Sequence, residues 1–312
     1  MMRGALLPLS WALAGFAGAS TGFVVPASPF AASACRAQHG MCMAAAEPVV
    51  DGDVVVVCGA TGGVGRLVTE SLSSLGCYKV RAVTRNPERE RAAGGLGELP
   101  GVEVVPGDVR DHSTLEGAVR DAAVVVSCAG TTAFPSGKWG GGNTPDQVDR
   151  LGVENLVAAA AAEGSHPGGG KLKRFLLLSS VGVERRDRFP FSVLNTFGVL
   201  DAKAKGEEAV RSTADARGFS YVILRPGRLV GEPFTNPDMA ALLQADMGAM
   251  TRRVAMRSGD KQAGDIARGS VAEAFVQALR QSGAADKTFT LVNVAGPKPS
   301  QAEWDAAFNS LT

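Results

Sequence analysis

The segment Gly59-Ala60-Thr61-Gly62-Gly63-Val64-Gly65 constrains the fold of this chain more than any other. It follows the apolar run Val54–Cys58 directly and opens a helical pattern that continues to Leu75. A strand, a glycine-rich turn and a helix in this order suit a pyrophosphate, because a turn without side chains lets backbone N–H groups reach the phosphate oxygens. We expect Gly59 to allow the tight turn, Gly62 the close approach, and Gly65 the packing of helix on strand. The expected cofactor contacts in this segment are Gly59, Thr61, Gly62, Gly63, Val64 and Gly65.

From Asp53 onward, the chain alternates short apolar runs with helical patterns, which is typical of βαβ units and a parallel sheet. The apolar runs do not alternate with polar residues, as expected for strands that are buried on both faces. The sequence therefore predicts a doubly wound α/β fold. The predicted strands are 54–58, 80–84, 102–105, 123–128, 175–179, 221–224 and 287–293. The predicted helices are 65–75, 113–120, 146–163, 201–217, 266–280 and one that starts at Ser300.

The end of the second predicted strand, Thr84-Arg85-Asn86, bears on the choice between NAD and NADP. NAD sites usually carry Asp or Glu there to bind the ribose 2′-OH, whereas this chain has no acid before Glu88. Arg85 and Arg66 are candidates to clamp a 2′-phosphate, because a guanidinium forms planar, charge-assisted hydrogen bonds. The alternative is that both arginines are solvated surface residues. The missing acid favours NADP(H) as the cofactor.

Two further pairs of residues fit a cofactor groove. Asp108 and Val109 follow the third predicted strand, where an adenine contact would lie. Ala129 and Gly130 follow the fourth, where small residues let the backbone approach the sugar. Because ligands of such sheets bind at the carboxyl ends of the strands, these positions are expected to converge on the glycine turn.

The first 46 residues differ in composition from the rest of the chain, since they hold no Asp or Glu. Residues 1–20 have an early Arg3, an apolar run and small residues at the end, which is the layout of a secretory signal. Residues 21–47 form an acid-poor, transit-like segment with Phe23 near its start. Together they resemble the bipartite presequence of algae with secondary plastids and predict a plastid protein, in the stroma or associated with thylakoids. The alternative is a secreted protein, which the missing disulfide pattern disfavours.

Charge and cysteine spacing exclude other classes of function. The formal net charge is +1, so no basic field indicates a nucleic-acid partner. The five cysteines show no CxxC spacing and the three histidines have no metal-ligand spacing, so we expect neither a metal site nor a disulfide framework. Cys58 and Cys128 close apolar runs and are expected to be small buried residues. No apolar run beyond the leader predicts a transmembrane segment.

An ordered set of motifs extends from residue 53 to residue 312: GATGGVG at 59–65, VRAVTRNPER at 80–89, GDVRD at 107–111, LLLSSVGVE at 176–184, LDAKAKGEEAV at 200–210, LRPGRLVGE at 224–232 and DIARGSVAEAFVQAL at 265–279. With this set the chain resembles the atypical short-chain dehydrogenase/reductase superfamily, in particular its NAD(P)H-binding, NmrA-like branch. The resemblance implies a Rossmann domain over residues 48–312, with a small substrate lobe at 232–262 in its C-terminal part. Pro226 of the LRPG motif is added to the expected cofactor contacts.

The resemblance also implies catalytic positions, and here the chain departs from active relatives. Those relatives place a tyrosine four residues before a lysine as general acid/base, with a serine that orients the substrate. Ser180 and Lys203 match the serine and the lysine, whereas Val199 stands in the place of the tyrosine. Aligning Lys205 instead gives Asp201, and the two tyrosines of the chain are Tyr78 and Tyr221, neither of which is expected near the nicotinamide.

Lys203 is therefore expected to bind the cofactor ribose, with a second option as acid/base and an alternative as a solvated helix residue. Ser179 and Ser180 either contact the cofactor or substrate, or cap the loop backbone.

Two functions follow from the whole pattern. The first is a plastid NADPH-dependent oxidoreductase that acts on a small or isoprenoid-like substrate without the tyrosine relay. The second is a non-catalytic NADPH-binding scaffold or redox sensor in the assembly or tethering of plastid complexes. The missing tyrosine favours the scaffold, whereas the methionines of the expected lobe, Met239, Met247, Met250 and Met256, favour an apolar substrate and the enzyme.

Overall fold

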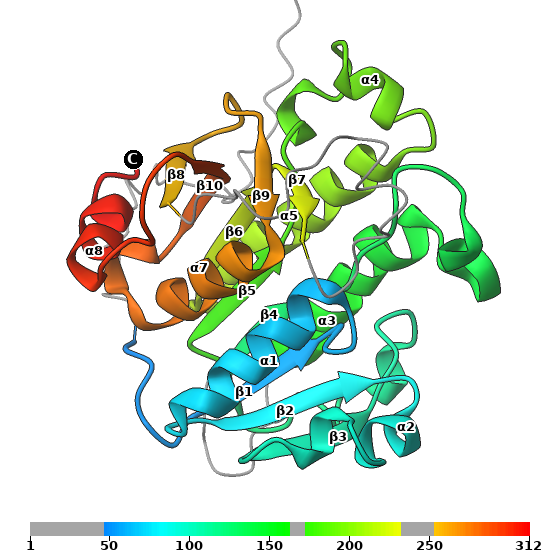
Figure 1. Ribbon diagram of the computed structural model, residues 1–312. Coiled ribbons are helices and arrows are strands. Elements are labelled where there is room, and N and C mark those ends of the chain that lie inside the picture. Colours follow the sequence, from blue (N-terminus) through cyan, green and yellow to red (C-terminus); the bar gives the residue numbers. More distant parts are fainter. Residues whose placement is uncertain (1–46, 163–171, 232–252) are drawn as a thin grey trace, which may run out of the picture. The chain divides into compact units, whose positions relative to one another are not determined.

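The structure is a computed structural model, and it describes residues 47–162, 172–231 and 253–312. Its centre is an eight-stranded sheet in the order β3-β2-β1-β4-β5-β6-β10-β8 (Figure 1). The order of the strands along the sheet reverses at β1, as in a doubly wound fold. Every neighbouring pair is parallel except β10 and β8. The strands are β1 Val54–Cys58, β2 Lys79–Thr84, β3 Val102–Pro106, β4 Ala122–Ser127, β5 Arg174–Leu178, β6 Ser220–Pro226, β8 Arg253–Ser258 and β10 Lys287–Val294. The predicted fold class is confirmed.

Helices cover both faces of the sheet, and β1 shows why its sequence is apolar throughout. Val55 and Val57 belong to the core under α1 (Gly63–Leu75) and α7 (Arg268–Arg280), whereas Val56 and Cys58 belong to the core under α3 (Gly152–Ala160) and α5 (Val199–Arg217). These four strand residues are all completely buried. A strand that supplies both faces needs an unbroken apolar run rather than an alternating one.

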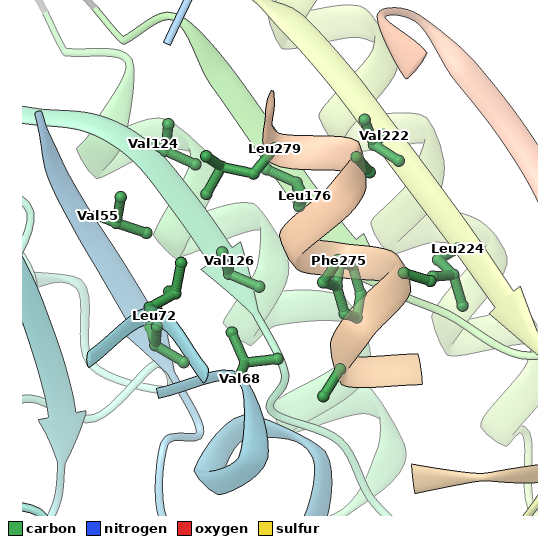
Figure 2. Packing of buried hydrophobic residues seen from close by; sticks show 14 of the residues in the cluster. Val55, Val68, Leu72, Val124, Val126, Leu176, Val222, Leu224, Phe275 and Leu279 are labelled. Atoms are coloured by element: carbon green, nitrogen blue, oxygen red, sulfur yellow. The ribbon is translucent and has the colours of Figure 1, made fainter. Parts of the chain in front are cut away.

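Figure 2 shows the first of these cores. Val68 and Leu72 of α1, and Phe275 and Leu279 of α7, lie against the aliphatic side chains of β1, β4, β5 and β6. The C-terminal helix α8 (Gln301–Asn309) extends the same core with buried Trp304 and Phe308. Ser300 starts α8 with a capping box to Glu303, at the position where the sequence predicts that helix to begin.

The remaining elements are short and were not predicted. They are α2 Pro87–Arg91, α4 Phe191–Leu194, and the two-stranded parallel pair of β7 Arg228–Val230 and β9 Asp265–Ala267. The helix predicted at 113–120 is wrong, because only a 3₁₀ turn forms there, at His112–Thr114. Asp111 accepts from the Ser113 N–H and the Thr114 hydroxyl donates to the Asp111 carbonyl, and such local polar bonds compete with a continuous helix. The helix predicted at 146–163 begins with a π-helical turn, Asp146–Leu151, before α3.

Two sequence predictions fall wholly or partly outside the described residues. The presequence 1–46 does so completely. Of the expected lobe 232–262, residues 232–252 also lie outside, whereas residues 253–258 form the edge strand β8 of the main sheet. Among the helices of the described ranges, none is both long and apolar enough to cross a membrane.

Candidate functional site

A cavity of about 940 Å³ lies at the carboxyl ends of the central parallel strands, where doubly wound sheets bind ligands. Its wall includes residues that directly follow β1, β2, β3, β4 and β5, together with the last residue of β6. Of the positions expected from the sequence, those in the wall are Gly59, Thr61, Gly62, Gly63, Val64, Arg85, Asp108, Val109, Ala129, Gly130, Ser179, Ser180, Lys203 and Pro226. Residues from six separate motifs therefore meet at one edge of the sheet.

The glycine turn is closely packed, and two of its glycines have no room for a side chain. Gly59 has a φ of +75°, and a Cβ there would lie 2.6 Å from the Ala129 nitrogen. A Cβ on Gly65 would lie 2.2 Å from the Gly59 carbonyl oxygen, so this glycine sets the approach of α1 to the turn. Gly62 precedes the first residue of α1, and no side chain caps the helix there. The first N–H groups of α1 thus lie in the cavity wall with the positive end of the helix dipole.

Two arginines, Arg85 and Arg110, line the cavity near the ends of β2 and β3. The Arg85 guanidinium donates to the Asn143 side-chain oxygen at 2.8 Å. Arg110 makes a forked contact with Asp108, at 3.0 and 3.1 Å from its Nε, and this hydrogen bond lowers the pKa of Asp108 below its ordinary value. Arg110 and Asn143 were missed by sequence reasoning, although Arg110 lies within the quoted motif GDVRD.

The charges of the cavity wall are mostly positive. Among the described lining residues, five side chains are cationic and one is a carboxylate, namely Arg85, Arg110, Lys203, Arg228, Arg268 and Asp108. Lys203 and Arg228 are paired with carboxylates outside the wall, Asp149 and Asp265, but the remaining excess of positive charge still favours an anionic ligand. The wall therefore suits a ligand that carries phosphate groups.

Two of the expected residues lie outside the cavity wall. Gly65 packs behind the turn, in agreement with the role in helix packing that was expected for it. The Arg66 side chain donates to Glu70 at 3.0 Å and to the Gly94 carbonyl at 3.3 Å. The structure therefore does not bring Arg66 together with Arg85 at the cavity.

The side chains expected near the reacting end all have partners within the protein. The Ser179 hydroxyl donates to Glu207 Oε1 at 2.6 Å, and the Ser180 hydroxyl donates to the Val181 carbonyl at 3.0 Å. The Lys203 ammonium donates to Asp149 Oδ1 at 2.7 Å. Neither Tyr78 nor Tyr221 lines the cavity.

Behind Ser179 lies a buried pair of charges. Arg225 of β6 donates to both carboxylate oxygens of Glu207 on α5, at 2.8 and 2.6 Å, and the two side chains are 2% and 1% exposed. Burial raises the pKa of Glu207, but the hydrogen bonds and charge of Arg225 outweigh this effect, and the net pKa is below the ordinary value. Glu207 is therefore an ionised carboxylate that accepts hydrogen bonds from both the Arg225 guanidinium and the Ser179 hydroxyl.

Two thiols, Cys58 and Cys128, also line the cavity. Burial raises the pKa of Cys58 to about 12, and burial with the nearby Cys58 raises the pKa of Cys128. Both are protonated at neutral pH and therefore poor nucleophiles. Cys58 is completely buried, as expected, whereas Cys128 is only partly buried. The described residues contain no cluster of side chains that could hold a metal ion.

The region that matches a known protein family contains most of the cavity wall. The family model described as NAD(P)H-binding matches residues 59–282, which run from the first glycine of the turn to the end of α7. The chain belongs to this NAD(P)H-binding family. The NAD(P)H binding that the resemblance implied for this domain is thereby confirmed as the property of its family.

Several relatives of the chain are chloroplast proteins. It is 31% identical over 189 residues to Protein TIC 62, chloroplastic, of Arabidopsis thaliana, which covers 56% of this chain and 27% of that protein. The chain thus spans about a quarter of the length of this relative. It is also 31% identical over 264 residues to an uncharacterized chloroplastic protein of Arabidopsis thaliana, which covers 82% of each chain.

Solved structures show the same fold. The oxidoreductase ylbE of Lactococcus lactis superposes with a TM-score of 0.59 at 20% identity, covering 82% of this chain and 95% of that one. A short-chain dehydrogenase/reductase of Veillonella parvula in complex with NADP gives a TM-score of 0.54 at 14% identity, covering 79% and 97%.

Proposed function

We propose that this protein is a plastid NADPH-dependent oxidoreductase. The observation that carries the proposal is the meeting, in one cavity, of the glycine turn, Arg85, Ser180 and Lys203. NADPH bound there would supply a hydride, and the protein would supply the position of the reacting groups. The NAD(P)-binding domain is assigned to residues 48–312. The substrate lobe expected at 232–262 is proposed for residues 232–252 alone, because residues 253–258 form β8 of the main sheet.

The chain's own residues fit NADP(H) in three places. The N-terminus of α1 with Gly62 and Gly63 suits the pyrophosphate, because N–H groups and the helix dipole favour an anion. Arg85 suits a 2′-phosphate, and Lys203 suits the hydroxyls of a ribose. Asp108, Val109, Ala129 and Gly130 complete the wall beside the expected adenosine.

The substrate in this proposal is small or isoprenoid-like, and its protonation does not use the usual tyrosine. No tyrosine lines the cavity among the described residues, so the proton comes from water, from the substrate or from another side chain. The chloroplast relatives and the composition of residues 1–47 support a plastid location.

A second function, a non-catalytic NADPH-binding scaffold for plastid complexes, is favoured by the same lack of a tyrosine. The partners already held by Ser179 and Ser180 also favour it, since neither hydroxyl is left without a hydrogen-bond acceptor. Both proposals require NADPH binding, but only the oxidoreductase oxidises the bound NADPH.

NADPH is expected to raise the melting temperature of the protein more than NADH does. At a concentration one hundred times the Kd, a ligand stabilises the folded state by about 2.7 kcal/mol, which corresponds to about 5–10 °C for a domain of this size. The measurement is thermal unfolding with NADPH, with NADH and without nucleotide. NADPH oxidation upon addition of a plastid extract would support the enzyme, and stabilisation without oxidation would support the scaffold. No shift with either nucleotide would contradict both.

The Arg85→Ala variant is expected to bind NADPH about tenfold more weakly than the wild type and NADH equally well. A charge-assisted bond to the 2′-phosphate is worth about a factor of ten in affinity, and NADH has no phosphate there. Titrations followed by nucleotide fluorescence measure both constants. Arg89→Ala is the control, because Arg89 is an exposed arginine of the same segment that does not line the cavity. An equal loss for both nucleotides would refute the assignment of Arg85 to the 2′-phosphate.

A further inference from the structure

Asp149 is a buried carboxylate that the sequence motifs did not single out. Its side chain is 1% exposed and accepts hydrogen bonds from three donors. They are the Lys203 ammonium at 2.7 Å, the Thr131 N–H at 3.1 Å and the Thr131 hydroxyl. A buried carboxylate with these donors is fully engaged and rigid. Asp149 does not itself line the cavity, whereas Lys203 and Thr131 do.

Three local features bring Asp149 to Lys203. Asp149 lies within the π-helical turn that precedes α3, and such turns shift the direction of side chains from that of a regular helix. Gly206 of α5 packs so closely that a Cβ there would lie 2.5 Å from the Asp149 carbonyl oxygen. Lys203 stands three residues earlier on α5, on the same side of the helix as Gly206. The close helix contact therefore also brings the ammonium within reach of the carboxylate.

Gly130 completes the arrangement from the end of β4. A Cβ on Gly130 would lie 3.1 Å from Asp149 Oδ1 and 3.4 Å from Lys203 Nζ. The ion pair thus lies directly against the backbone of a residue that lines the cavity. A lysine ammonium has three N–H donors, and Asp149 is the acceptor of one.

We propose that Asp149 is a positioning residue, which holds the Lys203 ammonium against Gly130 so that its remaining N–H donors face the ribose of the bound nucleotide. This inference rests on the proposed NADPH site. A long lysine side chain otherwise samples many rotamers, and fixing it in advance lowers the entropy cost of binding. Asp149 also balances the charge of Lys203 in a poorly solvated place, without placing a carboxylate beside the nucleotide phosphates.

The test compares Asp149→Asn with a matched control, Asp53→Asn, in the full chain. Asp53 is also paired with a lysine, at 2.9 Å from Lys173 Nζ, and is 14% exposed, but neither residue lines the cavity. Asp149→Asn is expected to weaken NADPH binding about tenfold, because it keeps the size of the side chain and removes the charge that holds the ammonium. Asp53→Asn is expected to bind NADPH as the wild type does. Binding is measured at a temperature where circular dichroism shows all variants folded.

A double-mutant cycle with Lys203→Gln separates positioning from a general loss of structure. The Asp149→Asn change is expected to have no further effect on NADPH affinity once Lys203 is replaced. A second readout needs no cofactor: labelling of Lys203 by acetic anhydride in the nucleotide-free protein, followed by mass spectrometry. Labelling is expected to increase severalfold in Asp149→Asn, because the carboxylate no longer holds the Lys203 nitrogen, and to stay unchanged in Asp53→Asn.

The outcomes are distinguishable. If the wild type binds NADPH and Asp149→Asn binds it equally well, the positioning role is wrong and the proposed function stands. If the losses of Asp149→Asn and Lys203→Gln simply add, Asp149 acts on the fold and not through Lys203, which also overturns the inference. If the wild type does not bind NADPH, the proposed function fails and the inference fails with it.

Discussion

The Glu207→Ala variant is expected to lose about 3–5 kcal/mol of its free energy of unfolding. Removing this carboxylate takes away the two hydrogen bonds that the buried Arg225 guanidinium donates to Glu207, and it leaves Ser179 without its acceptor. Among the residues that the structure describes, Glu184 then remains to compensate the charge of Arg225, and its side chain is half-exposed. Since domains are typically stable by about 5–15 kcal/mol, the loss is a large share of the total. Urea unfolding followed by circular dichroism measures the change.

The control for this result is Glu208→Ala, the next residue of α5. Its side chain is exposed, so the same substitution is expected to change stability by at most about 0.5 kcal/mol. Replacing both buried partners, as in Glu207→Leu with Arg225→Met, is expected to recover much of the loss, because no charge then remains buried. A Glu207→Ala protein as stable as Glu208→Ala would show that the pair is not what holds β6 to α5.

The Gly65→Ala variant is expected to lose about 1–3 kcal/mol of stability, with NADPH binding weakened more than tenfold. The new methyl group would lie 2.2 Å from the Gly59 carbonyl oxygen, and both groups belong to backbone that cannot rotate away. The N-terminus of α1 must then move outward, and the N–H groups proposed for the pyrophosphate move with it. Nucleotide titration and urea unfolding measure the two effects.

Gly269→Ala is the matched control for this glycine. Gly269 also lies in the first turn of a helix, α7, but a Cβ there meets nothing within 4 Å. Alanine is better than glycine in a helix by up to about 1 kcal/mol, so this variant is expected to be slightly more stable, with unchanged NADPH affinity. If Gly65→Ala behaves in the same way, the close packing of α1 on the turn does not limit the site.

The doubly wound sheet, most of its strands and many residues of the cavity wall could be predicted because they depend on local patterns. The run Val54–Cys58 is apolar at every position, and this alone indicates a strand that is buried on both faces. The glycines at 59, 62 and 65 then indicate the tight turn, and the helical pattern that follows it indicates that the chain passes from the strand directly into a helix. Ligand positions follow from topology, since carboxyl ends of parallel strands lie along one edge of the sheet.

The contacts between distant side chains could not be predicted in the same way. Asp149 and Lys203 are 54 residues apart, and their meeting depends on a π-helical turn and on Gly206. Nothing in a local pattern indicates either feature. The same holds for Ser179, which was considered as a cofactor contact, whereas its hydroxyl is held by Glu207. Arg66 was expected near Arg85 because it follows the glycines, but on α1 it points to Glu70, one helical turn further on.

The two thiols in the cavity wall have a consequence for how this protein responds to its chemical surroundings. Disulfide exchange and alkylation both need a thiolate, and with a pKa of about 12 Cys58 is almost entirely uncharged at neutral pH. Cys128 is shifted in the same direction. Changes in the glutathione or thioredoxin pool are therefore expected to leave these two thiols largely unmodified. In the proposed function, nucleotide binding at this cavity is therefore expected to be independent of the reduction state of the thiol pool.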